Sequence, residues 1–170
     1  MDVRHPDIKK FITMKHNLAK VTGANVSVRI TDDFMRAVEL GTSYALRWPI
    51  NNSGEYEVGE IVEARDIWKL IVESATKTAE PGILMWDNII NNLPAHCYKD
   101  VGFETLTTNP CGEIPLSAYD SCRLVSINLK NLVDDAFTKK AKFDYNKLSE
   151  VAAMAMRLSD DLVELEIEKL

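Results

Sequence analysis

The sequence lacks the features that mark secreted, membrane-spanning and nucleic-acid-binding proteins. Its 170 residues include only three cysteines, in no even framework, which argues against a disulfide scaffold and favours thiols kept reduced until they are used. No apolar run approaches the roughly 20 residues of a membrane helix, and charged residues follow Met1 where a signal peptide would be apolar. The net charge is −6 with no basic run, which argues against binding a polyphosphate backbone. These absences predict a cytoplasmic protein that binds neither membranes nor nucleic acids, although free nucleotides remain possible ligands.

The composition suits a globular chain, yet the sequence at both ends is typical of the interior of a longer chain. Hydrophobic residues make up 46% of the sequence, enough to build a core. Val3-Arg4 resembles the middle of a continuing strand, and residues 164–170 stop inside a helical pattern without a closing glycine or proline. We therefore expect an internal piece of a larger protein.

Strand and helix patterns alternate along the chain, which predicts an α/β fold with at least partly parallel pairing. Helices are expected at residues 6–16, 31–41, 64–80 and 87–92, and strands at 26–30, 83–86, 103–108 and 125–129. Residues 44–62 should form a hairpin with its turn at 51–54, and residues 93–101 a polar connection. A long helix should follow Asp144 and bury the stripe Leu148, Val151, Ala152, Ala155, Leu158, Leu162 and Leu165.

Residues 108–117 place three reactive side chain types at alternate positions: Asn109, Cys111 and Glu113. In extended chain, alternate residues share one face, so the three could converge on one small molecule. An amide orients hydroxyls, a thiol does nucleophilic or radical chemistry, and a carboxylate takes a proton. Pro110 and Gly112 suit a loop that holds one shape and is closely approached by a ligand.

This stretch resembles the active-site region of the large catalytic subunit of ribonucleotide reductases. The resemblance rests on Asn-Pro-Cys-Gly-Glu at 109–113 and Ser-Cys-Arg-Leu-Val-Ser-Ile-Asn-Leu at 121–129. The Pro and Gly that flank the thiol are more similar to the adenosylcobalamin-dependent class than to the di-iron class. Further stretches agree in the family's order, up to about Asn131: His5-Pro6-Asp7-Ile8 with Phe11-Ile12 and Lys15, then residues 25–28, 31–35 and 79–83.

The resemblance implies a fold and a chemistry. Residues 1–170 should form roughly half of a ten-stranded α/β barrel, with a hairpin excursion, long helices and the active-site loop at 108–117. By resemblance, Cys111 becomes a thiyl radical that removes the 3′ hydrogen of the ribose, Glu113 takes the 3′ hydroxyl proton, and Asn109 hydrogen-bonds the ribose hydroxyls. The plainer alternatives are an inert buried cysteine, a solvated carboxylate and a turn residue.

The resemblance also assigns residues outside this loop. Cys122 corresponds to one of two thiols that deliver electrons, and its partner would lie on a strand before this chain. The loop that carries the signal from an allosteric nucleotide to the substrate base corresponds to Leu18, Ala19, Lys20, Val21, Thr22, Gly23 and Ala24, although a plain connector is nearly as consistent with these residues. His96 and Cys97 lack the spacing of a zinc site, so no metal site is expected.

The implied cofactor is adenosylcobalamin, bound mainly by residues outside this segment. The implied partners are a ribonucleotide substrate, a nucleotide effector, the remaining segments of the reductase and a thioredoxin-like reductant. Three readings stay open: a segment of an adenosylcobalamin-dependent reductase that is inactive alone, a segment of a di-iron or manganese reductase, or a non-enzymatic fragment that completes another chain's barrel. A half barrel has exposed strand edges, so we expect low stability unless something pairs with it.

Overall fold

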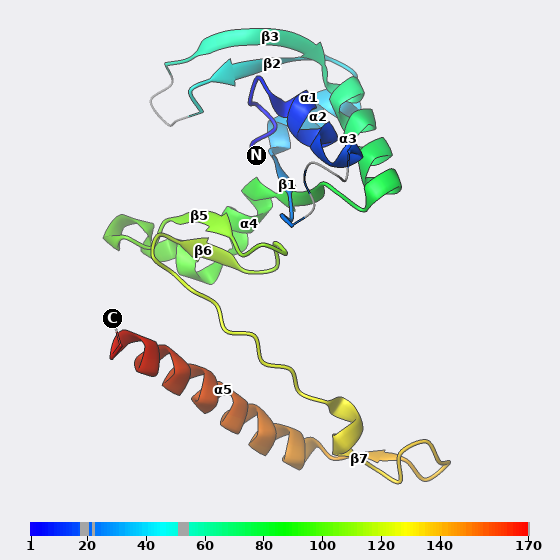
Figure 1. Ribbon diagram of the computed structural model, residues 1–170, viewed down its shortest axis with the longest axis vertical. Coiled ribbons are helices and arrows are strands. Elements are labelled where there is room, and N and C mark those ends of the chain that lie inside the picture. Colours follow the sequence, from blue (N-terminus) through cyan, green and yellow to red (C-terminus); the bar gives the residue numbers. More distant parts are fainter. Residues whose placement is uncertain (18–20, 22, 51–54, 170) are drawn as a thin grey trace. The chain divides into compact units, whose positions relative to one another are not determined.

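The computed structural model describes residues 1–17, 21, 23–50 and 55–169 (Figure 1). The chain divides into two compact units, Met1–Asp120 and Ser121–Leu170. The first contains most of the helices and strands, and the second contains a long helix with two very short strands.

A pair of parallel strands lies at the centre of the first unit. β1 (Ser27–Ile30) pairs with β4 (Gly82–Met85), with Ser27 opposite Gly82 and Ile30 opposite Met85. Val28 and Ile30 alternate with polar residues and are almost fully buried, as expected when one face of a sheet covers a core. The parallel pairing predicted from the sequence is confirmed for this pair.

Three helices complete the core of this unit (Figure 1). α1 (Ile8–Thr13) continues into a 3-10 turn (Met14–His16), α2 (Asp32–Leu40) follows β1, and α3 (Ala64–Thr78) precedes β4. α2 ends at Gly41, whose φ of 66° is the left-handed conformation that glycine tolerates. The buried residues of the three helices share a hydrophobic cluster, which includes Ile8, Ile12, Phe34, Ile67 and Ile71.

The predicted hairpin is confirmed and joins the same core. β2 (Ser43–Trp48) and β3 (Glu57–Glu63) run antiparallel, and each contributes one buried apolar side chain, Leu46 and Val62. The turn predicted at 51–54 lies outside the described residues.

The rest of the first unit differs from the prediction at residues 93–101 and again in the loop that carries Cys111. α4 (Trp86–Asn92) leads into residues 93–101, predicted as a polar connection, which form a 3-10 helix (Pro94–Val101). Proline at its first position needs no backbone N–H there, which favours a helical start. β5 (Thr105–Thr108) and β6 (Pro115–Ser117) then form an antiparallel hairpin, so residues 109–114 are its connection.

The second unit corrects two predictions. It contains a 3-10 turn (Leu129–Leu132), β7 (Val133–Asp134), β8 (Lys142–Phe143) and α5 (Tyr145–Ile167). Asp144 caps α5 as predicted, because its carboxylate accepts the backbone N–H of Lys147 at 2.9 Å. Residues 125–128 form no strand, since no neighbouring strand pairs with them in the described chain. The stripe on α5 is not buried: Leu158, Leu162 and Leu165 are 40–54% exposed, and Leu148, Val151 and Ala155 are only half-buried.

The described strands form four two-stranded sheets and no closed barrel. The mixed α/β class is therefore confirmed. Of the predicted half barrel, only the parallel pair β1 and β4 with its helices is present among the described residues. The remaining strand pairs are antiparallel hairpins. Among the described residues, no helix combines the length and the apolar character needed to cross a bilayer.

Candidate active site

The loop that carries Cys111 is a tight turn held by Asn109. The backbone N–H of Asn109 donates to the Ile114 carbonyl, and its side-chain Oδ1 accepts from the Ile114 N–H, both at 3.0 Å. The Gly112 N–H donates to the Asn109 carbonyl, also at 3.0 Å, and Gly112 has a φ of 89°. The stretch is therefore not extended, and the expectation that alternate residues share one face does not apply to it.

The turn places its three polar side chains in different surroundings. Asn109 is buried, with 7% of its surface exposed, whereas Cys111 and Glu113 are exposed. An exposed Cys111 differs from the plainer alternative of an inert buried thiol. The chemical roles expected for the three residues remain predictions.

Cys111 lies at the wall of a polar cavity of about 400 Å³. The Asn25 amide donates a hydrogen bond from Nδ2 to the Cys111 Sγ at 3.5 Å. The cavity is further lined by Ser27 at the start of β1, by Glu80 beyond the end of α3, and by Gly82. These residues come from stretches that carried the family resemblance, and the structure brings them together around the thiol.

An ion pair holds Glu80, one of the residues that line this cavity. The Lys15 side chain is buried and pairs with the Glu80 carboxylate. The Oε1 atom of Glu80 also accepts the backbone N–H of Val26 at 3.1 Å. The pKa of Glu80 is lowered by the hydrogen bond from Lys15 and, more weakly, by that from Val26, while burial acts in the opposite direction. Both charged residues lie in motifs that carried the family resemblance, and a charge inside such a motif is the signal that could have predicted the pair.

A second cavity, of about 380 Å³, shares Asn25, Ser27 and Pro110 with the first and adds Asn109 and Leu84. Two glycines allow the close approach of segments here. A Cβ atom at Gly112 would lie 3.1 Å from Leu84 Cδ2, and one at Gly82 would lie 2.8 Å from Ser27 Oγ. The Cys111 turn therefore lies against β4, and Gly82 beside β1, at separations that leave little room for a side chain.

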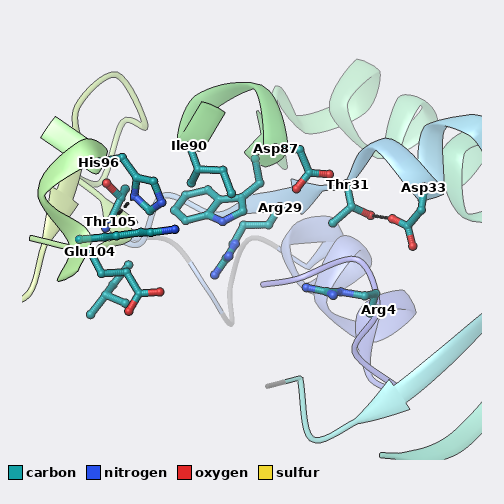
Figure 2. Close-up of a pocket in the computed structure, with 12 residues that line it drawn as sticks. Arg4, Arg29, Thr31, Asp33, Asp87, Ile90, His96, Glu104 and Thr105 are labelled. Atoms are coloured by element: carbon teal, nitrogen blue, oxygen red, sulfur yellow. Dashed lines mark hydrogen bonds between the residues drawn. The ribbon is translucent and has the colours of Figure 1, made fainter. Parts of the chain in front are cut away.

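A third cavity, of about 500 Å³, does not include Cys111 and shares Arg29, Trp86 and Leu106 with the second (Figure 2). The Arg29 guanidinium lies 3.7 Å from the centre of the Trp86 ring, and its buried Nε atom has no hydrogen-bond partner among the described residues. Burial lowers the pKa of Arg29. Arg4, on the same cavity, is bound at 2.7 Å by Asp2. None of these residues was predicted from the sequence to belong to a functional site.

The other residues singled out from the sequence lie in three places along the chain. Cys122 belongs to the second unit and is half-buried, and Cys97 is an exposed free thiol. In the segment predicted to carry an allosteric signal, Val21, Gly23 and Ala24 have no regular structure, while Leu18, Ala19, Lys20 and Thr22 lie outside the described residues. The part of the chain that the structure describes contains no group of three His, Cys, Asp or Glu residues arranged to hold a metal ion.

Comparison with known proteins identifies the family. The family model described as "Ribonucleotide reductase, barrel domain" matches residues 1–170. The chain is 37% identical over 165 residues to a vitamin B12-dependent ribonucleoside-diphosphate reductase of Thermoplasma acidophilum, which covers 96% of this chain and 20% of that protein. It is 34% identical to the Mycobacterium tuberculosis enzyme of the same description, over 97% of this chain and 22% of the relative.

The chain thus belongs to the ribonucleotide reductase family, as a segment of the barrel domain. It spans about a fifth of the length of these relatives. The resemblance read from the motifs is confirmed, including the vitamin B12-dependent character of the relatives.

Proposed function

We propose that this chain supplies the thiol-bearing part of the catalytic site of an adenosylcobalamin-dependent ribonucleotide reductase, which converts ribonucleotides to deoxyribonucleotides. The observation that carries the proposal is the exposed Cys111 on a fixed turn beside a polar cavity of about 400 Å³. Cavities of about 300–1,000 Å³ with a few polar groups are typical of small-molecule sites.

In the proposed reaction Cys111 begins and ends as a thiyl radical. It removes the hydrogen from C3′ of the ribose and becomes a thiol, while Glu113 takes the proton of the 3′ hydroxyl. The 2′ hydroxyl then leaves as water. A dithiol that includes Cys122 supplies two electrons and two protons and becomes a disulfide, Glu113 returns its proton to the 3′ oxygen, and Cys111 returns its hydrogen to C3′. The substrate gains two electrons, the dithiol loses them, and Cys111 is regenerated.

Asn109 would hold the sugar. Its Oδ1 atom already accepts the Ile114 N–H, so the two hydrogens of its Nδ2 atom are the groups that can reach ribose hydroxyls. Residues 18–24 would couple an effector nucleotide to the substrate base, and a thioredoxin-like protein would reduce the disulfide that contains Cys122.

Adenosylcobalamin does not fit the described residues as a whole ligand. A corrin ring with its nucleotide tail is larger than the cavities of about 380–500 Å³ found in the first unit. We therefore assign its binding to other parts of the enzyme. When bound, it would be the source of the organic radical that oxidises the Cys111 thiol.

A second candidate function keeps the chemistry and changes the radical source. The putative reductase large subunit of Frog virus 3 is 36% identical over 139 residues, 76% of this chain, and its description does not include vitamin B12. A di-iron or manganese partner subunit would then supply the radical. Activity that persists after cobalamin is removed would favour this candidate.

The test is the substitution Cys111→Ser in the complete enzyme, whether that is one polypeptide or is assembled from several. A serine hydroxyl cannot exchange hydrogen with carbon as a thiol does, so deoxyribonucleotide formation should fall to background. Cys97→Ser, a change at another exposed thiol of the same unit, is the matched control and should retain activity. Continued turnover by Cys111→Ser would overturn the proposal, and turnover by the 170-residue chain alone would exclude a purely non-enzymatic fragment.

A further inference from the structure

We propose that Asn25 is a positioning residue for the Cys111 thiol, and that the ion pair between Lys15 and Glu80 holds Asn25 in place. The use of the positioned thiol rests on the proposed function. The contact itself does not, because it can be tested without turnover.

The direct observation is the hydrogen bond from the Asn25 amide to sulfur. Asn25 Nδ2 lies 3.5 Å from Cys111 Sγ, which is within the range for a donor to the larger sulfur atom. Asn25 also lines both cavities beside the Cys111 turn. It is therefore a side chain that both contacts the thiol and lines the two spaces in which a ligand could sit.

Asn25 is itself exposed, so its position must be fixed through its backbone. The neighbouring residue Val26 has both backbone polar groups engaged. Its N–H donates to Glu80 Oε1 at 3.1 Å, and its carbonyl accepts the Gly82 N–H at 2.9 Å. Glu80 is held in turn by the Lys15 ammonium. Because Lys15 is only 6% exposed, water competes weakly for this pair.

The chemical consequence concerns the direction of the S–H bond. Sulfur in a thiol carries one hydrogen and is a weak acceptor. An amide hydrogen that occupies the acceptor side of sulfur leaves the S–H bond to point elsewhere, where it can face a sugar carbon. Asn25 would neither gain nor lose electrons or protons; it would restrict the orientations that Cys111 samples.

The first test measures alkylation of Cys111 by iodoacetamide, with each cysteine quantified by peptide mass mapping. Asn25→Asp keeps the shape of the side chain but replaces the donor with a carboxylate next to the sulfur. Two like charges at about 4 Å in water repel by about 1 kcal/mol, so alkylation of Cys111 should slow about fivefold. Cys97 in the same sample should react at an unchanged rate, and an unchanged circular dichroism signal would report that the unit remains folded.

The matched control for the added charge is Asn91→Asp. Asn91 is an exposed residue of α4 that lines neither of the two cavities. This variant should leave the Cys111 rate unchanged. Equal Cys111 rates in the wild type and Asn25→Asp would overturn the proposed contact.

The second test asks whether Glu80 acts through Asn25. In a double-mutant cycle of Asn25→Ala and Glu80→Ala, the double variant should alkylate at Cys111 at the rate of Asn25→Ala alone, because the anchored group is already gone. If the changes in the Cys111 alkylation rate caused by the two single substitutions multiply in the double variant, Glu80 does not act through Asn25. If Glu80→Ala loses its circular dichroism signal and so does not fold, the cycle is repeated with Lys15→Met in its place, again combined with Asn25→Ala.

The complete enzyme provides a readout that separates positioning from substrate binding. Asn25→Ala should lower kcat while KM for the ribonucleotide stays within about twofold, since the interaction removed acts on the thiol. A raised KM at unchanged kcat would make Asn25 a substrate ligand and refute its role as a positioning residue. Failure of the proposed function would show differently, as activity retained by Cys111→Ser, and would leave the alkylation results standing.

Discussion

The Glu80 carboxylate accepts the backbone N–H of Val26 at 3.1 Å, and this bond ties the segment after α3 to the residue that precedes β1. The same carboxylate pairs with Lys15, which follows α1. One side chain thus joins three segments that are distant in the sequence. The thiol-bearing turn lies beside the place where they meet.

Removing Glu80 should destabilise the first unit more than removing Lys15. Glu80→Ala leaves the Lys15 ammonium buried without a partner, and we expect a loss of about 2–3 kcal/mol, below the ~3–5 of fully buried pairs because the Glu80 side chain is 21% exposed. Lys15→Met leaves a carboxylate that water can reach and should cost about 1 kcal/mol. Urea unfolding midpoints at constant m-value measure both. Equal losses would contradict the predicted asymmetry.

The lowered pKa of Glu80 predicts a dependence of stability on acid. The carboxyl group ionises with an ordinary pKa of 4.5 when the chain is unfolded, and with a lower one when it is folded. The unfolded state therefore binds more protons in this range, and the stability from Glu80 is full above 4.5 and lost as the pH falls through the folded pKa.

The measurement is the free energy of unfolding of the wild type and Glu80→Gln between about pH 3 and pH 6. The difference between the two proteins should shrink as the pH falls. Burial raises the pKa of Asp2, but the hydrogen bonds from Arg4 and the positive charges of Arg4 and Arg29 lower it overall, so Asp2 adds a similar loss to both proteins. A difference that grows toward acid would contradict the sign given for Glu80.

The turn that carries Cys111 should be sensitive to a single methyl group. Gly112→Ala would place a Cβ atom 3.1 Å from Leu84 Cδ2 at a φ of 89°, and left-handed backbone alone costs a non-glycine residue about 1–2 kcal/mol. Gly23→Ala is the control, because no atom lies within 4 Å of its added Cβ. Thermal unfolding and the alkylation rate of Cys111 should both change in Gly112→Ala. If both variants match the wild type, the turn is less constrained than described.

Arg29 should be replaceable without loss of stability. Its contact with the Trp86 ring contributes about 0.5–2 kcal/mol, whereas a buried nitrogen without a partner costs about 1–3 kcal/mol. Arg29→Met keeps an unbranched chain over the ring and removes the unpaired Nε atom. We expect unfolding free energies within about 1 kcal/mol of the wild type, or higher. A loss above about 2 kcal/mol would mean that the guanidinium has a stabilising partner.

The features that sequence reasoning predicted well are those coded by local signals. The alternation of Val28 and Ile30 with polar residues marked β1, and Gly41 marked the end of α2, because each signal acts within a few residues. The hairpin of β2 and β3 has the same origin, since its two strands adjoin one turn.

The Cys111 turn shows how a chemical pattern can mislead about geometry. Side chain types at alternate positions suggested extended chain. Proline and glycine at the second and fourth positions of Asn-Pro-Cys-Gly are instead the signature of a β-turn, and the Gly112 N–H indeed bonds back to the Asn109 carbonyl. The turn could have been predicted from these two residues alone.

The failures in the second unit have a different cause. The apolar stripe of α5 and the pattern at 125–129 indicate surfaces that pack, but periodicity does not tell which segment covers them. Neither is covered within residues 121–169. The contact of Asn25 with Cys111 was also beyond prediction, because it depends on the pairing of β1 with β4.

That pairing has a consequence for the order of events during folding. The other strand pairs of the described chain are hairpins, whose strands are brought together by one short segment, whereas β1 and β4 are separated by α2, a whole hairpin and α3. Forming such a pair costs the entropy of closing a long loop, so the pair should form late during folding. Until it forms, the thiol of Cys111 is an ordinary solvated cysteine, so the surroundings proposed to direct its reactivity arise only once the first unit has completed its fold.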